Sequence, residues 1–250
     1  MEYKDEKPRV CLVDWDGTLR KGYMFLDWMP FLTRELNLPA IHQKRVTDIF
    51  EDFHAERISY GGLIDDIADA YAATLEGQKA DDVREVAIQF AKQDNGLFSF
   101  VQDTTARLSE MGMTIIVVSG SPIEVLEAFA PRIYADRVLA LQIEQNVQGI
   151  HTKRVVRNFG NVSEKEAAIE ILKTDYSISM AFGNSFADIP LLRAANDRFY
   201  VIESPDDIQN LNKNAELNEL NPTYLFPDDS GIIDHIFGSV VSAHNAVAPG

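Results

Sequence analysis

Short apolar runs alternate along the chain with longer amphipathic stretches. The runs at residues 10–13, 114–118, 180–182 and 199–202 have the composition of buried strands, and the stretches between them are typical of helices. This alternation predicts an α/β fold, a mainly parallel Rossmann-like sheet flanked by helices. The first three runs end in clusters of Asp, Ser, Gly or Asn. Because ligands bind at the carboxyl ends of such strands, we expect these clusters to converge.

The segment between the first two runs is too long for a simple crossover. It holds about 95 residues with helical periodicity, whereas a βαβ crossover needs only a dozen or more. We predict helices at residues 25–36, 42–54, 62–71 and 81–93. The chain is therefore expected to contain a helical domain at residues 20–96, inserted into a core domain of residues 1–19 and 97–250.

The later part of the chain predicts a small β-hairpin and a further helix. Alternating residues at 138–159 surround polar turn residues, which is typical of a hairpin. A helix is predicted at residues 163–172 with Ser163 as its N-cap. Residues 210–250 are assigned only to the end of the core fold and a frayed tail.

Composition and charge narrow the classes of partner. The chain has 250 residues with 46% hydrophobic and 25% charged residues, which is typical of a folded protein. A net charge of −16 disfavours nucleic acid and anionic membrane surfaces. No apolar stretch reaches the roughly 18 residues of a membrane span, and the start of the chain is charged. We therefore expect no membrane partner, no signal peptide and a cytoplasmic location.

Outside the strand ends, the cysteine, histidine and aromatic residues show no pattern that favours a functional site. Cys11 is the single cysteine and lies within an apolar run, so a buried, inert thiol is expected. The five histidines show no metal-binding spacing. Phe25, Trp28 and Phe31 recur at helical spacing, which favours the interior of the helical insertion over a substrate platform.

The strongest candidate site follows the first apolar run. Residues 10–19 read Val-Cys-Leu-Val-Asp-Trp-Asp-Gly-Thr-Leu, so a strand leads directly into Asp14 and Asp16. Two carboxylates this close repel each other unless a cation neutralises them, and oxygen-only ligation suits Mg²⁺. A strand that ends in an ordinary polar turn is the alternative.

Three further segments complete the candidate set. Ser119 and Gly120 end the second run, and Ser121 with Pro122 resembles a helix start with serine as N-cap. A lysine opens the helix predicted at residues 163–172, and the third run leads into a polar segment at residues 183–188.

Together these segments resemble the four motifs of the haloacid dehalogenase (HAD) superfamily, in the branch that contains phosphoserine phosphatases (subfamily IB). The resemblance implies the HAD fold, a helical cap between the first and second motifs, and Mg²⁺ as cofactor. It also implies that Asp14 attacks phosphorus and that Asp16 acts as general acid and base. Ser119 and Lys165 would contact the phosphoryl group. The implied metal ligands are Asp14, Asp16, Asn184 and Asp188.

The sequence departs from the family pattern at two places. Asn184 stands where the family has an acidic residue, so the implied ligand there is neutral. Basic and aromatic residues follow the first motif where phosphoserine phosphatases have an acidic residue, so the resemblance does not extend to serine specificity and the substrate stays open. Lys153 and Lys173 are rivals of Lys165. The expected substrate contacts are Thr18, Ser119, Gly120, Lys165, Arg20 and Arg57, the two arginines being surface cations in the alternative interpretation.

The resemblance implies a Mg²⁺-dependent phosphatase of the phosphomonoester hydrolase class (EC 3.1.3.-). Its substrate is expected to be a small phosphorylated metabolite, hydrolysed through an aspartyl-phosphate at Asp14. The alternatives are a catalytically weakened protein with a binding or regulatory role, suggested by Asn184, and a phosphotransferase. The sequence leaves the oligomeric state open.

Overall fold

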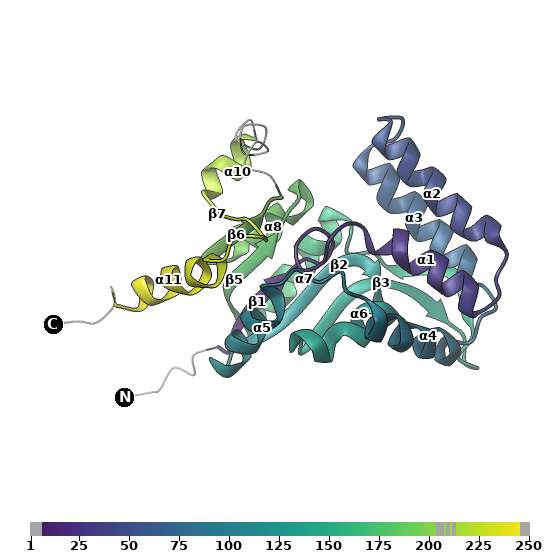
Figure 1. Ribbon diagram of the computed structural model, residues 1–250, viewed down its shortest axis with the longest axis horizontal. Helices are drawn as coiled ribbons and strands as arrows, with labels where there is room; N and C mark the ends of the chain where they lie inside the picture. Colours follow the sequence, from purple (N-terminus) through teal and green to yellow (C-terminus); the bar gives the residue numbers. More distant parts are fainter. Residues whose placement is uncertain (1–6, 204–207, 209–210, 212–213, 246–250) are drawn as a thin grey trace.

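The computed structural model describes residues 7–203, 208, 211 and 214–245. Within these residues, seven strands form one sheet in the order β4-β3-β2-β1-β5-β6-β7 (Figure 1). Neighbouring strands are parallel except β3 and β4, which are antiparallel. The predicted α/β class with a mainly parallel sheet is confirmed.

The strands lie where the apolar runs predicted them. The parallel strands are β1 Arg9–Val13, β2 Thr114–Pro122, β5 Ser177–Gly183, β6 Asp197–Val201 and the short β7 Thr223–Leu225. Strands β3 Arg137–Gln145 and β4 His151–Arg157 form the predicted hairpin. Strand β7 had not been predicted, because its three residues are too few to show a periodicity.

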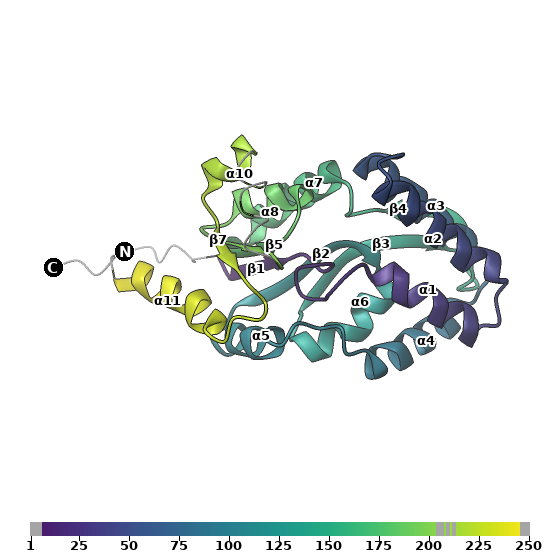
Figure 2. The ribbon, with the colours of Figure 1, turned by 45° about the horizontal axis from the view of Figure 1, so that its top comes forward.

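Alternate residues of β1 pack against helices on opposite faces of the sheet. Val10 and Leu12 belong to one apolar cluster, while Cys11 and Val13 belong to the other. Figure 2 shows the two helical layers. The first cluster lies under α7 Val162–Asp175, α8 Ile189–Ala194 and α10 Ala215–Leu220, and the second under α5 Val101–Glu110, α6 Ile123–Phe129 and α11 Ile232–Asn245.

Two predicted helix caps are wrong. Helix α7 begins at Val162 with Asn161 as N-cap, so Ser163 lies inside its first turn. Helix α6 begins at Ile123 after Pro122, and no side chain caps it. Ser121 instead remains in strand β2, because its hydroxyl has a partner in the site described below.

The weak assignment of residues 210–250 is replaced in part by regular structure. The described residues there include α10, β7 and α11. The predicted tail at residues 246–250 and the charged residues 1–6 lie outside the described residues. None of the helices in the described part of the chain is both long enough and apolar enough to cross a membrane.

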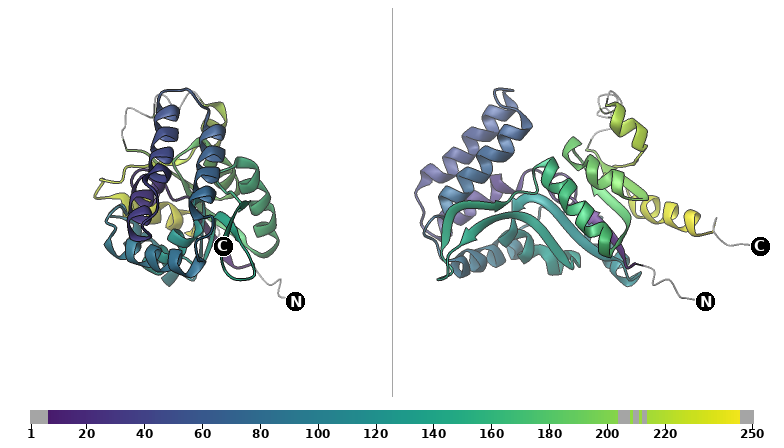
Figure 3. Two further views of the ribbon diagram at one scale, coloured as in Figure 1. Left: turned by 90° about the vertical axis from the view of Figure 1, so that its right-hand side faces the viewer. Right: turned by 180° about the vertical axis from the view of Figure 1, so that it is seen from behind.

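Four helices occupy the predicted insertion. They are α1 Met24–Glu35, α2 Ala40–His54, α3 Tyr60–Leu75 and α4 Ala80–Gln93. Seen from behind in Figure 3, the β3–β4 hairpin extends beneath α2 and α3. The turn after α3 is hydrogen bonded to this hairpin: Gly77 N–H donates to His151 O (3.0 Å) and Ala80 N–H to Gly149 O (2.8 Å). The insertion is thus fixed to the sheet by main-chain bonds.

A buried polar chain also links the insertion to the core. Trp28 Nε1 donates to the Tyr71 hydroxyl (3.3 Å), which donates to the Glu124 carboxylate at the start of α6 (3.2 Å). Burial raises the pKa of Glu124 to about 7. Trp28 is fully buried and Phe31 nearly so, in agreement with the predicted interior role of these two residues.

The two chain segments that enter and leave the insertion lie side by side. Lys21 N–H donates to Gly96 O and Phe98 N–H donates to Leu19 O. Between them Arg20 is only 2% exposed and pairs with Asp94 (2.6 Å) and Asp27 (2.7 Å). The prediction that Arg20 contacts substrate is therefore wrong, because its guanidinium is enclosed between the two carboxylates.

Replacing Arg20 should destabilise the protein. Arg20→Met leaves the buried Asp94 without its partner, so we expect the free energy of unfolding to fall by about 3 kcal/mol, near the lower end for a broken buried pair because Asp27 stays solvated. Denaturant unfolding measures this. Arg57→Met is the matched control and should change stability by less than about 1 kcal/mol, since Arg57 and its partner Asp52 are exposed. Equal effects of the two substitutions would contradict the structural role of Arg20.

Candidate active site

The polar ends of three adjacent strands meet at one cavity. Strand β1 lies between β2 and β5, so its carboxyl end adjoins theirs. A cavity of about 90 Å³ opens at this point, and its charged and amide side chains come from the strand ends and the start of α7. The polar side chains that line it are Asp14, Asp16, Tyr23, Tyr60, Ser119, Lys165, Asn184 and Ser185.

Lys165 bridges two carboxylates beneath the cavity. Its Nζ lies 3.1 Å from Asp14 Oδ1 and 2.5 Å from Asp188 Oδ1, and its side chain is 2% exposed. Although burial alone would lower it, the two carboxylates raise the pKa of Lys165 above its ordinary value. Lys165 therefore remains charged and supplies a fixed positive charge beside Asp14.

Asp14 lies in an environment that opposes its negative charge. Burial and the neighbouring Asp188 raise the pKa of Asp14 to about 7, and Lys165 offsets only part of this shift. A carboxylate in this state is poorly solvated. It gains stability from any further cation, and it is more reactive toward an electrophile than a hydrated carboxylate.

Asp188 is fully buried and holds Lys165. Its Oδ2 accepts hydrogen bonds from Asn184 N–H (3.1 Å), Ser185 N–H (3.0 Å) and the Ser185 hydroxyl (2.8 Å), while Oδ1 accepts from Lys165. Asp188 does not line the cavity. In this geometry Asp188 positions the lysine and the Asn184 loop, while its implied role as a metal ligand stays a prediction.

Asp16 lies across the cavity and is fixed from two directions. Its Oδ2 accepts from the Ser121 hydroxyl (2.8 Å) and its Oδ1 from Met24 N–H at the start of α1 (2.9 Å). Burial raises the pKa of Asp16 to about 6, although both hydrogen bonds oppose the shift. An acid with a pKa this close to neutrality can both give and take a proton.

Thr18 and Asn184 lie next to Asp14, and of the two only Asn184 lines the cavity. Thr18 is fully buried, and its Oγ1 lies 3.1 Å from Asn184 Oδ1 and 3.3 Å from Asp14 Oδ2. The hydroxyl has one proton, so only one of the two acceptors receives it. The predicted contact of Thr18 with substrate is therefore not seen, because its hydroxyl faces these two residues.

The donor set fits Mg²⁺. Asp14, Asp16 and Asn184 present oxygen atoms around one cavity. Because the Thr18 hydroxyl has one proton, either Asp14 Oδ2 or Asn184 Oδ1 receives no hydrogen bond from it and is available to a cation. Mg²⁺ binds through one or two carboxylates and keeps several waters. No cluster of three Asp, Glu, His or Cys side chains suited to a metal occurs in the part of the chain that the structure describes, so a magnesium site here depends on the neutral Asn184.

The first turn after β1 brings Asn184 close because residue 17 is glycine. Gly17 has φ +73°, and a Cβ at this position would lie 2.0 Å from Asn184 Nδ2. A larger residue would therefore be strained and would displace Asn184. The glycine of the Asp-x-Asp-Gly sequence is thus explained by contact between the first and fourth predicted motifs.

Ser119 and Gly120 line the cavity from the carboxyl-terminal part of β2. Ser119 is 2% exposed, and its Oγ accepts from Ser121 N–H (3.2 Å), which leaves its own proton for a ligand. Gly120 packs directly on the loop before α7, since a Cβ on it would lie 2.8 Å from Gly160 Cα. Both residues line the cavity, as the sequence predicted.

The remaining predicted cations lie elsewhere. Arg57 follows α2, is exposed and pairs with Asp52, and it does not line the cavity. Of the rivals to Lys165, Lys173 pairs with the exposed Glu170 and Lys153 lies on β4. Lys165 is thus the lysine that the structure places beside Asp14.

Four polar contributors, Ser121, Ser185, Tyr23 and Tyr60, are not among the site residues that the sequence predicts. Ser121 was interpreted as a helix cap, whereas it holds Asp16. Ser185 and Asp188 form a capping box, a Ser-x-x-Asp pattern that was visible in the sequence and would have placed the serine against the carboxylate. Tyr60, at the start of α3, also lines the cavity, but no local pattern distinguishes it from a surface tyrosine.

The insertion contributes the apolar part of the lining. Helix α3 adds Leu63, Ile64 and Ile67, while Phe25 of α1 and Phe50 of α2 add aromatic rings. Phe25 thus both belongs to the core of the insertion and faces the cavity. The cavity therefore has a charged side from the sheet and an apolar side from α1–α3.

The comparisons with known proteins agree with this fold. Residues 11–193 match the family model described as haloacid dehalogenase-like hydrolase. A search of curated proteins gave no match. Among solved structures, a protein with unknown function from Bordetella pertussis Tohama I is similar with a TM-score of 0.70 at 18% identity, covering 88% of this chain and 99% of that chain.

Two further solved structures carry functional names. A probable phosphoserine phosphatase from Vibrio cholerae is similar with a TM-score of 0.65 at 13% identity, covering 97% of this chain and 68% of that chain. A phospho-aspartyl intermediate analogue of phosphoserine phosphatase is similar with a TM-score of 0.59 at 17% identity, covering 94% and 99%. At these identities the likeness concerns the fold.

The contact between Gly120 and Gly160 yields a prediction. Gly120→Ala places a methyl group against main-chain atoms that cannot give way, so we expect a loss of about 1–3 kcal/mol in unfolding free energy. Gly160→Ala is the matched control, because its methyl group meets side-chain atoms rather than main chain, namely Ile64 Cγ2 (2.9 Å) and Cδ1 (3.0 Å), and should cost less. Thermal or denaturant unfolding of both variants measures the two losses of stability. A larger loss for Gly160→Ala than for Gly120→Ala would contradict the described packing.

Proposed function

Because the chain belongs to the haloacid dehalogenase-like hydrolase family, we propose that it is a phosphatase that hydrolyses a small phosphomonoester through Asp14. The observation that carries this proposal is the arrangement of Asp14, Asp16 and Lys165 around one cavity. The structural neighbours support it, since their names include phosphoserine phosphatases and a cytosolic 5′-nucleotidase IIIB.

In the first step Asp14 forms a bond from a carboxylate oxygen to phosphorus. The bond between phosphorus and the ester oxygen breaks, and Asp16 gives its proton to the departing alkoxide. Ser119 donates its free hydroxyl proton to the phosphoryl oxygens, and Lys165 balances their charge. The products of this step are the alcohol and an aspartyl-phosphate.

In the second step water hydrolyses the aspartyl-phosphate. Asp16, now a carboxylate, takes a proton from the water as its oxygen bonds to phosphorus, and the bond to Asp14 breaks. Inorganic phosphate leaves and Asp16 is again protonated. Ser121 and Met24 hold Asp16 in a fixed position. This suits both proton transfers, because the same carboxyl group protonates the leaving oxygen in the first step and deprotonates water in the second.

We propose Mg²⁺ as the cofactor, held by Asp14, Asp16 and Asn184. When bound, it supplies positive charge that offsets the charge of the phosphoryl group. Asp188 is left out of the ligand set and is proposed to orient Lys165 instead. The same proposal assigns residues 20–96 as a cap domain that shields the site from bulk water.

Asp14→Asn should abolish turnover while the fold remains intact. An amide does not attack phosphorus but has nearly the same volume, and more than a few per cent of the wild-type rate with p-nitrophenyl phosphate would contradict the role of Asp14. Stability is the control. Because the pKa of Asp14 is raised from 3.8 to about 7, ionising it in the folded protein lowers stability, and this loss accumulates between about pH 4 and pH 7 and is fully present above that range. In metal-free buffer at pH 8 the variant should therefore unfold no more easily than wild type.

Asn184→Asp should tighten the binding of Mg²⁺. The substitution adds a negative charge beside the proposed cation, so the Mg²⁺ concentration that gives half-maximal initial rate should fall, although turnover need not rise, because the added charge repels phosphate. The rate is measured against Mg²⁺ at matched ionic strength, with Asp188→Asn for comparison. For Asp188→Asn, the fold decrease in the rate at saturating Mg²⁺ should exceed the fold change in the half-saturating Mg²⁺ concentration. An unchanged half-saturating concentration in a folded Asn184→Asp variant would remove Asn184 from the ligand set.

A further inference from the structure

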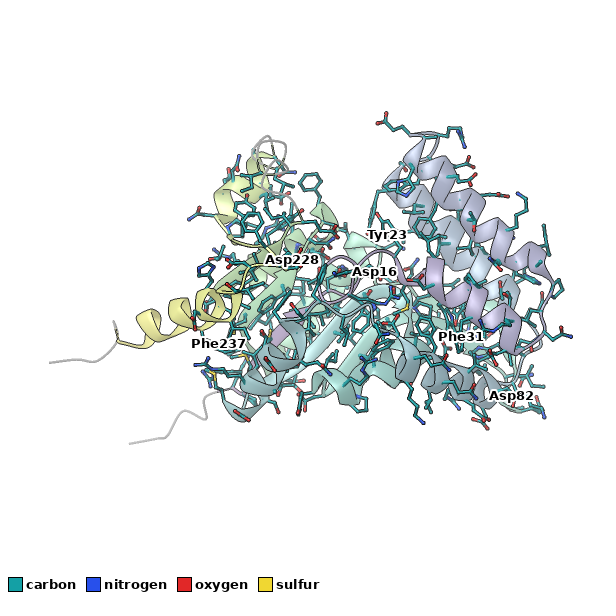
Figure 4. The ribbon with its side chains drawn as sticks, viewed as in Figure 1. Asp16, Tyr23, Phe31, Asp82, Asp228 and Phe237 are labelled. Atoms are coloured by element: carbon teal, nitrogen blue, oxygen red, sulfur yellow. The ribbon has the colours of Figure 1, made fainter. Side chains whose placement is uncertain are left out.

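The cavity offers a leaving group almost no charged partner. The side opposite Asp14 is built by α1–α3, and among the described residues these helices contribute no Lys, Arg, Asp or Glu to the lining. Tyr23, which precedes α1, and Tyr60 contribute hydroxyl groups, and the rest is aliphatic or phenyl. Figure 4 shows Tyr23 beside Asp16, with Phe31 farther along α1 and away from both.

Each nearby cation already has another role. Arg20 is enclosed by Asp94 and Asp27, and Arg57 is exposed outside the cavity. Lys165 is the one cation in the described lining, and both Asp14 and Asp188 hold it. A carboxylate on the leaving group would therefore be buried without a positive partner, which is costly.

An ammonium group on the leaving group fares no better. The carboxylates in the described lining are those of Asp14 and Asp16, and the proposed reaction uses both. An ammonium group on the leaving group would thus face Phe25, Leu63 and other apolar side chains. The lining from α1–α3 therefore disfavours a leaving group with either a positive or a negative charge.

The volume of the cavity limits size as well. About 90 Å³ is available, and a single water needs about 10–15 Å³ by the same measure. A phosphoryl group and a few carbon atoms fill such a space. A space of this size favours a compact alcohol over an extended one.

From this lining we propose that the enzyme acts on phosphomonoesters of small, uncharged, largely apolar alcohols. The proposal rests on the proposed phosphatase function and adds the class of leaving group. It places selection on the apolar side chains of α1–α3 rather than on the residues at the strand ends. Ile64 is a suitable probe, because it is only half-buried and packs over Gly160 at the edge of the phosphate side.

The first test compares two esters that differ mainly in charge. O-phosphoserine and isobutyl phosphate both carry phosphate on a primary carbon, but methyl groups replace the ammonium and carboxylate in the second. With wild-type enzyme and Mg²⁺, kcat/KM for isobutyl phosphate should exceed that for phosphoserine by roughly a hundredfold. Equal values, or a preference for phosphoserine, would overturn the inference alone. If neither ester nor p-nitrophenyl phosphate were hydrolysed, the proposed function would fail and the inference with it.

The second test changes the wall. Ile64→Asn replaces alkyl surface by an amide and should lower kcat/KM for isobutyl phosphate by about tenfold while leaving that for phosphoserine unchanged or higher. Ile88→Asn is the matched control, since Ile88 on α4 is 48% exposed and does not line the cavity, and it should leave the ratio of the two values as in wild type. A parallel loss for both esters in Ile64→Asn would show a merely structural effect and overturn the assigned selectivity.

Discussion

The buried ammonium group of Lys165 is the interaction on which the site depends. Asp14 and Asp188 repel each other in surroundings that give their charges little solvation, and Lys165 lies within hydrogen-bonding distance of both. A buried charge of this kind is tolerated only when it is paired and hydrogen bonded. Ser185 and two main-chain amides complete the environment of Asp188. The end of β1, the start of α7 and the loop after β5 are consequently held in one arrangement.

The helical insertion takes part in this arrangement through one main-chain amide. Met24 N–H binds Asp16, and Met24 is the first residue of α1. The start of α1 is in turn fixed by Arg20, which joins Asp27 of α1 to Asp94 at the other connection. A buried ion pair outside the cavity thus determines where a hydrogen bond to the proposed acid lies. The position of the insertion and the geometry of the site are therefore coupled, because Arg20 fixes the start of α1 and the first amide of α1 binds Asp16.

Sequence patterns predicted the parts of the structure that are local. The strands ending at Asp14, Ser119 and Asn184 were visible because buried strands have distinct composition, and parallel strands bring such ends together. The partners of Arg20 were not visible, since Asp94 lies 74 residues away and charge alone does not reveal pairing. A motif likewise gives the residue type and spacing of Asp188 but not the partners of its oxygens, which the structure places against Lys165 and Ser185.

The neutral side chain at position 184 is consistent with the balance of charge in the cavity. Asp14, Asp16 and Asp188 outnumber the single ammonium of Lys165, so the ionised site remains negative before any phosphate enters. The apolar wall formed by α1–α3 offers no hydration to one side of the cavity and so strengthens the charge interactions within it. A further carboxylate there would increase repulsion toward an incoming phosphate. Asn184 offers the proposed cation an oxygen without adding this repulsion, and the excess charge of the three aspartates is left for the cation itself to offset.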